Sequence, residues 1–370
     1  MKNIRNIRFL LCALALITQG CVRDGLNECP PSVRYAISFE YLLHSSLDAN
    51  NNPINLFAEE VEKMYVYVFD HETGICACAD TTLTGPFEAG DIYTLPLITG
   101  VYDIIIWGWG RNTGDPDLRR STGVIPAVVV PGETKIDNVR FILNELNNSS
   151  KDSVSGKIER TFFGEISNND IPPFVSRIDT VSLMNLSRKI RVIIPDIEND
   201  AENFPNWRNN VKITIEGDNG AYFFKTASGA GAPTIDPLNG RVIYSPYETY
   251  YTDQILKDDP IFSTGFDQED DHVGLVVDIS TLRLVLEDTD MKILIRWNDG
   301  TKNRSITLPL LELITRHPDY AWYSSSSSIQ KALDREDRWE IVFKMTDTVI
   351  TVATNILEWH VIKQDVIIGV

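Results

Sequence analysis

The 370-residue sequence is poor in basic residues. Lysine and arginine number 34 against 52 aspartates and glutamates, which gives a formal net charge of -18 at neutral pH. A chain this acidic repels phosphate backbones, and no basic stripe along it offsets the repulsion. We therefore expect no nucleic-acid partner and predict an extracytoplasmic, surface-facing protein.

The motifs of common enzymes are also missing. The chain has five histidines, and none lies in a His-Glu-x-x-His pattern; no Gly-x-Ser-x-Gly or Walker motif is present either. The acidic run at residues 267–272 could bind calcium, but it lacks the glycine and ligand order of an EF-hand, which favours a solvated loop. We expect no enzyme activity, no cofactor and no metal site.

Long hydrophobic runs are absent as well, and the longest lies near the N-terminus. Lys2, Arg5 and Arg8 precede an apolar run over residues 9–17. This pattern is typical of a secretory signal peptide, predicted at residues 1–20, and the run is too short to span a bilayer. Its removal takes away three basic residues and no acidic one, so the net charge becomes -18 - 3 = -21.

The signal ends at Gly20 and is followed at once by Cys21. This arrangement resembles the lipobox of bacterial lipoproteins, although Thr18 stands where leucine is usual. The resemblance implies that the Cys21 thiol carries acyl chains such as palmitate, with residues 21–32 as a lipidated tether. Two or more acyl chains hold a protein stably on a membrane. The alternative is an ordinary secretory signal that happens to precede a cysteine.

Cysteine is scarce, with five in the chain. Cys12 leaves with the signal and Cys21 would be acylated, so at most one disulfide can form among Cys29, Cys76 and Cys78. We expect Cys76 and Cys78 to share one face of a strand, and Cys29 could bridge to either. A metal site would need a fourth ligand, for which His71 is the nearby candidate. One disulfide or none is the favoured interpretation.

Apolar and polar residues alternate with a period of two through most of the chain. The pattern begins at residues 33–41 and is strongest at residues 64–70 and 100–109. Regular short strands with little helix predict an all-β protein of tandem β-sandwiches. The polar stretch at residues 144–152 predicts a boundary between an N-terminal sandwich, 33–150, and a C-terminal sandwich, 151–370. The mixed residues 161–174 are assigned to the start of the second.

Several further elements of the chain can be predicted individually. Residues 54–63 and 329–337 are the helix candidates, and residues 324–328 read as a serine-rich loop. The clearest hairpin joins residues 291–297 to 305–308. Strands are also expected at residues 124–130 and 137–143. The C-terminal residues 358–370 are favoured as a last strand, but their apolar end could instead be donated to a neighbouring subunit.

A set of these landmarks resembles the fimbrial anchor family of Bacteroidales, which includes FimB and the minor-fimbria anchoring lipoproteins. The set begins with a cysteine followed by spaced Asp, Leu and Cys-Pro residues, and it extends into both predicted domains. Its members here are Cys21, Asp24, Leu26, Cys29-Pro30, the strand 66–70 with Gly74, Gly100, Tyr102, Trp107-Gly108, the basic strand 186–192, and residues 334–337.

The resemblance implies two transthyretin-like Greek-key sandwiches, attachment to the outer membrane through acyl chains, and a fimbrial shaft subunit as partner. Two other hypotheses stay open, a pilus-tip adhesin or glycan-binding surface lipoprotein, and a hydrolase that carries a sandwich module. Trp107 and Trp109 share a strand face and could form a carbohydrate platform, although burial is favoured. Arg119-Arg120 would suit an arginine-specific protease, although an ordinary exposed loop is favoured.

Overall fold

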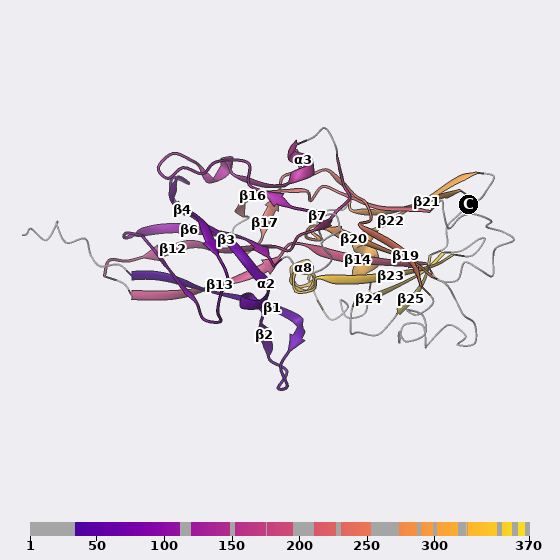
Figure 1. Ribbon diagram of the computed structural model, residues 1–370, viewed down its shortest axis with the longest axis horizontal. Coiled ribbons are helices and arrows are strands. Elements are labelled where there is room, and N and C mark those ends of the chain that lie inside the picture. Colours follow the sequence, from indigo (N-terminus) through magenta and orange to yellow (C-terminus); the bar gives the residue numbers. More distant parts are fainter. Residues whose placement is uncertain are drawn as a thin grey trace, which may run out of the picture.

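The structure is a computed structural model, elongated along one axis (Figure 1). It describes residues 34–111, 120–148, 152–174, 176–194, 211–226, 231–252, 274–286, 290–298, 302–316, 323, 325–345, 350–356 and 362–366. Strands dominate these residues, as the period-two pattern predicts, and the all-β class is confirmed. None of the described helices is long and apolar enough to cross a membrane.

The first sheet has eight strands and occupies one end of the molecule. In order across the sheet they are β2 (Pro53–Asn55), β1 (Arg34–Leu47), β13 (Ser176–Asn185), β12 (Thr161–Ile171), β6 (Gly100–Gly110), β3 (Val61–Asp70) and β4 (Cys76–Thr84), while β5 (Ile92–Leu95) pairs with β1. β13 runs parallel to β1 over eight residue pairs but meets antiparallel β12 over two.

This limited pairing lets the sheet fold over at β12–β13 into a sandwich. One core cluster fills the space between its layers, with aromatic residues from β1 facing branched residues from β3 and β6. Its members include Tyr35, Ile37, Phe39, Tyr41, Val66, Val68, Ile104, Ile106, Val181 and Leu183. Alternate residues of β3 and β6, such as Tyr67 and Trp107, point to the other face of the sheet and belong to a second cluster.

The other described strands form four smaller sheets. The five-stranded sheet contains β10 (Ser153–Val154), β18 (Val242–Tyr244), β15 (Lys212–Gly217), β21 (Lys292–Asn298) and β22 (Asn303–Pro309). The six-stranded sheet contains β19 (Glu248–Thr252), β20 (Gly274–Thr281), β14 (Arg188–Ile194), β23 (Arg338–Met345), β24 (Ile350–Ile356) and β25 (Ile362–Val366). The two smallest contain β17 (Pro233–Ile235), β16 (Ala221–Thr226), β9 (Arg140–Leu143) and β8 (Gly123–Val124), and β11 (Lys157–Ile158) with β7 (Arg120–Ser121).

The second core cluster is continuous through the molecule. It begins on the outer face of the first sandwich, where Trp107 stacks on Phe141 of β9 at a centroid separation of 4.4 Å. It continues into the five- and six-stranded sheets through residues such as Ile190, Ile215 and Ile341. Buried apolar contacts therefore join the two ends of the molecule.

Short helices connect the strands, namely α2 (Phe57–Glu60), η1 (Ile136–Asn138), α3 (Asn144–Asn148), α6 (Leu310–Thr315) and α8 (Ser326–Asp334). The predicted helix at residues 329–337 exists but begins three residues earlier. Ser325 is its N-cap, and Ser325 and Ser328 cap each other's backbone N–H groups. The serine-rich stretch thus starts a helix, which corrects the expectation of a loop.

The pairing of strands corrects two further expectations. The sequence pattern places residues 161–174 in the second sandwich, but β12 pairs with β6 from Thr161↔Trp109 to Ile171↔Gly100 and so belongs to the first sheet. Pairing therefore crosses the predicted boundary at residue 150, and the division into two domains stays a prediction. The strand expected at residues 124–130 stops at Val124; Pro126 and Pro131 limit its pairing, and Val128 is exposed.

Candidate functional site

The junction between the two main sheets, residues 185–188, links β13 directly to β14. Asn185, Leu186, Ser187 and Arg188 are all buried. The backbone N–H of Leu186 donates to Thr161 O at 2.6 Å, and the Asn185 side chain accepts from the backbone N–H and the hydroxyl of Ser187. The junction is buried and hydrogen-bonded, so it differs from the exposed, flexible linker typical between independent domains.

Arg188 carries a positive charge into this buried junction. Its guanidinium donates to Asn185 O, to Ser187 O at 3.3 Å and to Asp334 O at 3.4 Å, all of them backbone carbonyls. Burial lowers the pKa of the Arg188 guanidinium, while the charge of Asp334 acts in the opposite direction. A buried charge is costly without partners, so the three carbonyl groups must stay in place around Arg188, and this constrains the backbone of the junction.

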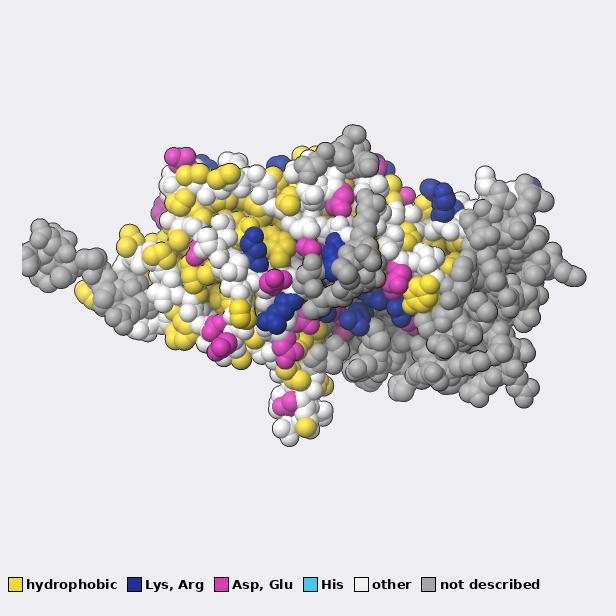
Figure 2. Space-filling model, viewed as in Figure 1, with side chains coloured by type: hydrophobic (Ala, Val, Ile, Leu, Met, Phe, Trp, Pro, Cys, Tyr) yellow, Lys and Arg dark blue, Asp and Glu magenta, His cyan; other side chains and the backbone are white. Residues whose placement is uncertain are grey.

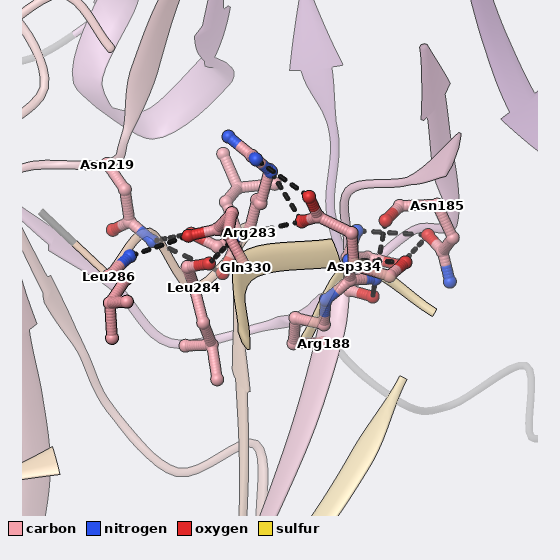
Figure 3. A network of polar contacts seen from close by, with 10 residues as sticks. Asn185, Arg188, Asn219, Arg283, Leu284, Leu286, Gln330 and Asp334 are labelled. Atoms are coloured by element: carbon pink, nitrogen blue, oxygen red, sulfur yellow. Dashed lines mark hydrogen bonds and ion pairs between the residues drawn. The ribbon is translucent and has the colours of Figure 1, made fainter. Parts of the chain in front are cut away.

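Asp334, the last residue of α8, holds the adjacent cluster of polar side chains (Figure 3). Arg283 donates to both of its carboxylate oxygens, at 2.7 and 2.8 Å, and Gln330 donates to one of them at 3.0 Å. Gln330 also donates to Leu284 O and accepts from the backbone N–H of Leu286. The bidentate arginine contact is the strongest type of ion pair in proteins, and it fixes α8 against residues 282–286.

A third set of contacts connects the same region to the first sandwich. Arg160, which precedes β12, forms an ion pair with Glu60 of α2 and lies 3.7 Å from Asp337. The backbone N–H of Lys189 donates to Asp337 O at 2.8 Å. The two sequence landmarks at residues 186–192 and 334–337 therefore lie side by side. Figure 2 shows basic and acidic side chains gathered near this middle part of the molecule.

The edges of the sheets are the places where another chain could add a strand. β25 ends the six-stranded sheet, and beyond it the sheet has no further strand among the described residues. It pairs antiparallel with β24 from Ile350↔Val366 to Thr354↔Ile362, which confirms the favoured prediction of a last strand. β22, at the edge of the five-stranded sheet, pairs with β21 as the predicted hairpin. An unpaired edge offers rows of N–H and C=O groups to an incoming strand.

The predicted cysteine arrangement changes in the structure. Cys76 and Cys78 are free, and Cys76 belongs to the continuous core whereas Cys78 packs against the core of the first sandwich. A bulge between β3 and β4 shifts the register, so the two lie on opposite faces of the sheet, not on one face as expected. Burial raises the pKa of Cys76 to about 11, which keeps this thiol protonated and unreactive. Cys21 and Cys29 lie outside the described residues.

The structure also describes some of the other residues that the sequence singled out, and others lie outside the described residues. Trp107 is buried, while Trp109 is half-buried beside Tyr65 and donates to Gly123 O. His71 pairs with Asp103 at 2.9 Å, and the described part of the chain holds no group of residues suited to a metal ion. Residues 267–272 and Arg119 lie outside the described residues. Sequence reasoning missed Arg283 and Gln330 because no motif marks them.

Comparison with known proteins identifies the class. The model of the fimbrillin-A associated anchor proteins Mfa1 and Mfa2 matches residues 26–365, so this chain belongs to that family and has a role associated with fimbriae. Among curated proteins, no sequence matches the chain.

Solved structures share the fold at low identity. A candidate polysaccharide-binding protein from Bacteroides thetaiotaomicron matches with a TM-score of 0.60 and 17% identity, over 88% of this chain and 98% of that one. The fimbrial anchor protein Mfa2 from Porphyromonas gingivalis matches with a TM-score of 0.53 and 16% identity, over 88% and 98%. A candidate adhesin from Bacteroides thetaiotaomicron matches with a TM-score of 0.57 and 19% identity, over 86% and 95%. At these identities the likeness shows the fold alone.

Proposed function

We propose that this protein is a lipid-anchored outer-membrane protein that holds or terminates a fimbria at the cell surface, without enzymatic activity. The observation that carries the proposal is the placement of its two ends. The first described strand, β1, begins at one end of the long axis, and β25 lies toward the other (Figure 1). A chain tethered at Cys21 would thus present the edge of the six-stranded sheet away from the membrane.

The junction suits such a role because an anchor must transmit pulling force. Force applied at β25 passes through β24 and β23 to β14, which pairs in parallel with β23 over five residue pairs. β14 continues through the buried junction into β13, which pairs with β1. Parallel strands pulled from opposite ends are loaded in shear, so several hydrogen bonds must break together. We infer that the fimbrial shaft subunit adds a strand at the distal edge.

The test compares cells that carry the full gene, no gene, and a gene lacking residues 361–370. We expect deletion of the gene to release fimbriae into the medium or to change their length. The shortened protein should melt cooperatively and fail to retain fimbriae. Unchanged fimbrial attachment and length after deletion of the whole gene would contradict the anchor and favour the tip adhesin. Collapse of the shortened protein would show that the fold cannot form without β25, and the test would then move to the β22 edge.

A further inference from the structure

The end of the first sandwich where β1 begins is closed by two apolar loops. Residues 96–99 connect β5 to β6, and residues 172–174 lie between β12 and β13. Pairing places both at one end, since Tyr35 pairs with Leu95 and Arg34 with Ser176, while Gly100 pairs with Ile171. Each loop therefore crosses from one layer of the sandwich to the other over the same end of the core.

These loops hold apolar side chains out in solvent. Ile98 is 70% exposed and Phe174 is 79% exposed, and on the adjoining strand Ile178 is 55% exposed. Pro96, Pro172 and Pro173 are exposed beside them. Single exposed apolar residues are common, as at Leu238, but a group at one end of a molecule marks an interaction surface. Figure 2 shows hydrophobic side chains along this end of the molecule.

The backbone at Phe174 supports the same conclusion. Its φ is +62°, a conformation that residues with a Cβ rarely adopt. Here the strained backbone holds an aromatic ring in solvent, so no burial of the ring offsets the strain. Strain of this kind in a non-glycine residue persists where the surrounding structure imposes it, commonly at binding surfaces.

Charge distinguishes this end from the rest of the chain. The chain as a whole has a net charge of -18, yet residues 96–99 and 172–174 contain no charged side chain. Charged groups lie at the rim, with Glu72 on the β3–β4 turn, Asp170 at the end of β12, and the Arg177–Asp179 ion pair on either side of Ile178. An acidic protein is repelled less by an anionic membrane where its own surface carries no negative charge.

We propose that this apolar end, formed by Ile98, Phe174 and Ile178, inserts into the headgroup region of the membrane that holds the lipidated Cys21. The inference rests on the proposed lipidation. Thirteen residue steps separate Cys21 from Arg34, so the first strand starts at most about 45 Å from the acylated residue. The tether thus keeps the end that carries Arg34 within reach of the bilayer, and aromatic and branched side chains suit the bilayer interface. A second attachment point would keep the long axis upright.

The first experiment measures depth in the lipidated full chain, reconstituted in vesicles of phosphatidylethanolamine and phosphatidylglycerol with or without brominated acyl chains. Phe174→Trp adds a fluorophore at the apolar end, and Leu238→Trp is the matched control at an 87% exposed site in another loop. We expect about half of the emission added at residue 174 to be quenched by bromine, and none of that added at residue 238. Equal quenching at the two sites, or none at residue 174, would overturn the proposal.

The second experiment separates insertion from lipidation. The full chain with Cys21→Ser is mixed with the same vesicles and sedimented, alone and with Ile98→Ser and Phe174→Ser together. Because both side chains are mostly exposed, the fold should tolerate the changes, and partitioning should fall about tenfold. Val128→Ser with Leu238→Ser is the control and should change nothing. If the unlipidated protein fails to partition at all, insertion is refuted even where Cys21 proves acylated; if Cys21 proves unmodified, partitioning still decides insertion.

Discussion

At the scale of single residues, Asp334 organises the middle of the molecule. Its carboxylate accepts from Arg283 and Gln330, and its carbonyl accepts from Arg188. The ion pair with Arg283 is well shielded, since the two side chains are 8% and 11% exposed. Removing one partner from such a pair leaves the other buried charge without its counter-charge.

We expect Asp334→Asn to lower the free energy of unfolding by about 3 kcal/mol, since Arg283 would lose its counter-charge. Urea denaturation measures the change. Asp290→Asn is the control, because Asp290 is 71% exposed beside Lys292 and an exposed pair contributes less than about 1 kcal/mol. Similar losses of unfolding free energy in the two variants would show that the buried cluster contributes no more to stability than an exposed ion pair.

The buried carboxylate of Asp278 on β20 should make the free energy of unfolding depend on pH. Burial pushes its pKa upward, but hydrogen bonds from Arg191, at 2.9 and 3.0 Å, and the charge of Lys189 outweigh burial and hold the pKa below its ordinary value. A lowered folded-state pKa contributes stability above the ordinary value of 3.8, and this contribution disappears as the pH falls through the folded-state pKa.

Asp278→Asn should therefore lower the free energy of unfolding by about 2–3 kcal/mol at pH 7 and by much less near pH 2. Denaturant titrations of both proteins across this range give the comparison. Asp137→Asn serves as control, since Asp137 is 63% exposed beside Lys225. A difference between wild type and Asp278→Asn that stays constant with pH would contradict the assignment.

At the scale of elements, α8 is short and depends on its cap. It has nine residues, and Ala332 and Leu333 are its buried apolar residues. Its polar side chains Gln330 and Asp334 make the contacts that hold residues 282–286. Isolated helices of this length are marginal in water, so its capping box and tertiary contacts must stabilise it.

Ser325→Ala should destabilise the protein by about 1 kcal/mol, because the N–H of Ser328 loses the Ser325 hydroxyl as an acceptor and keeps only the Ser325 carbonyl. Hydrogen exchange should rise first in α8. Ser327→Ala, at an exposed position inside the same helix, should be neutral or slightly stabilising, since alanine is the better helix former. Equal effects of the two substitutions would rule out the cap as a source of stability.

At the scale of the whole molecule, the continuous core and the buried junction join both ends. The first sandwich meets the six-stranded sheet through residues 185–188, and it meets the four-stranded sheet through the aromatic contacts of β6 with β9 and β16. Such an arrangement favours one elongated, stiff body over two loosely linked ones. Length and stiffness both suit a protein placed between a membrane and a fibre.

The proposed membrane attachment predicts the behaviour of Cys21→Ser. Without the acyl acceptor, most of the protein should leave the membrane fraction and keep only the weaker partitioning through the apolar end. Its melting temperature should stay the same because residue 21 precedes the first described strand. Mass spectrometry of the mature N-terminus should find acyl chains on wild-type Cys21. An unmodified Cys21 in the wild-type protein would contradict lipid anchoring and leave the fimbrial family membership intact.

The sequence by itself determined the class of the fold and most of its strands. Alternation such as that of Ile190, Val192 and Ile194 is a local property, and these three residues are buried as predicted. The hairpin of β21 and β22 was equally predictable, because few residues separate its strands. The landmarks at residues 186–192 and 334–337 could be found, but their contact could not.

Only the tertiary structure decided which strands pair and which side chains meet. A period of two indicates that one face of a strand is buried, but it does not indicate which strands cover that face. The sequence of β12 is therefore compatible with either sandwich. The bulge that separates Cys76 from Cys78 depends on the register between β3 and β4. Arg188 and Asp334 lie 146 residues apart in the chain. Contacts over such distances are set by the packing of the whole core, which no local pattern in the sequence records.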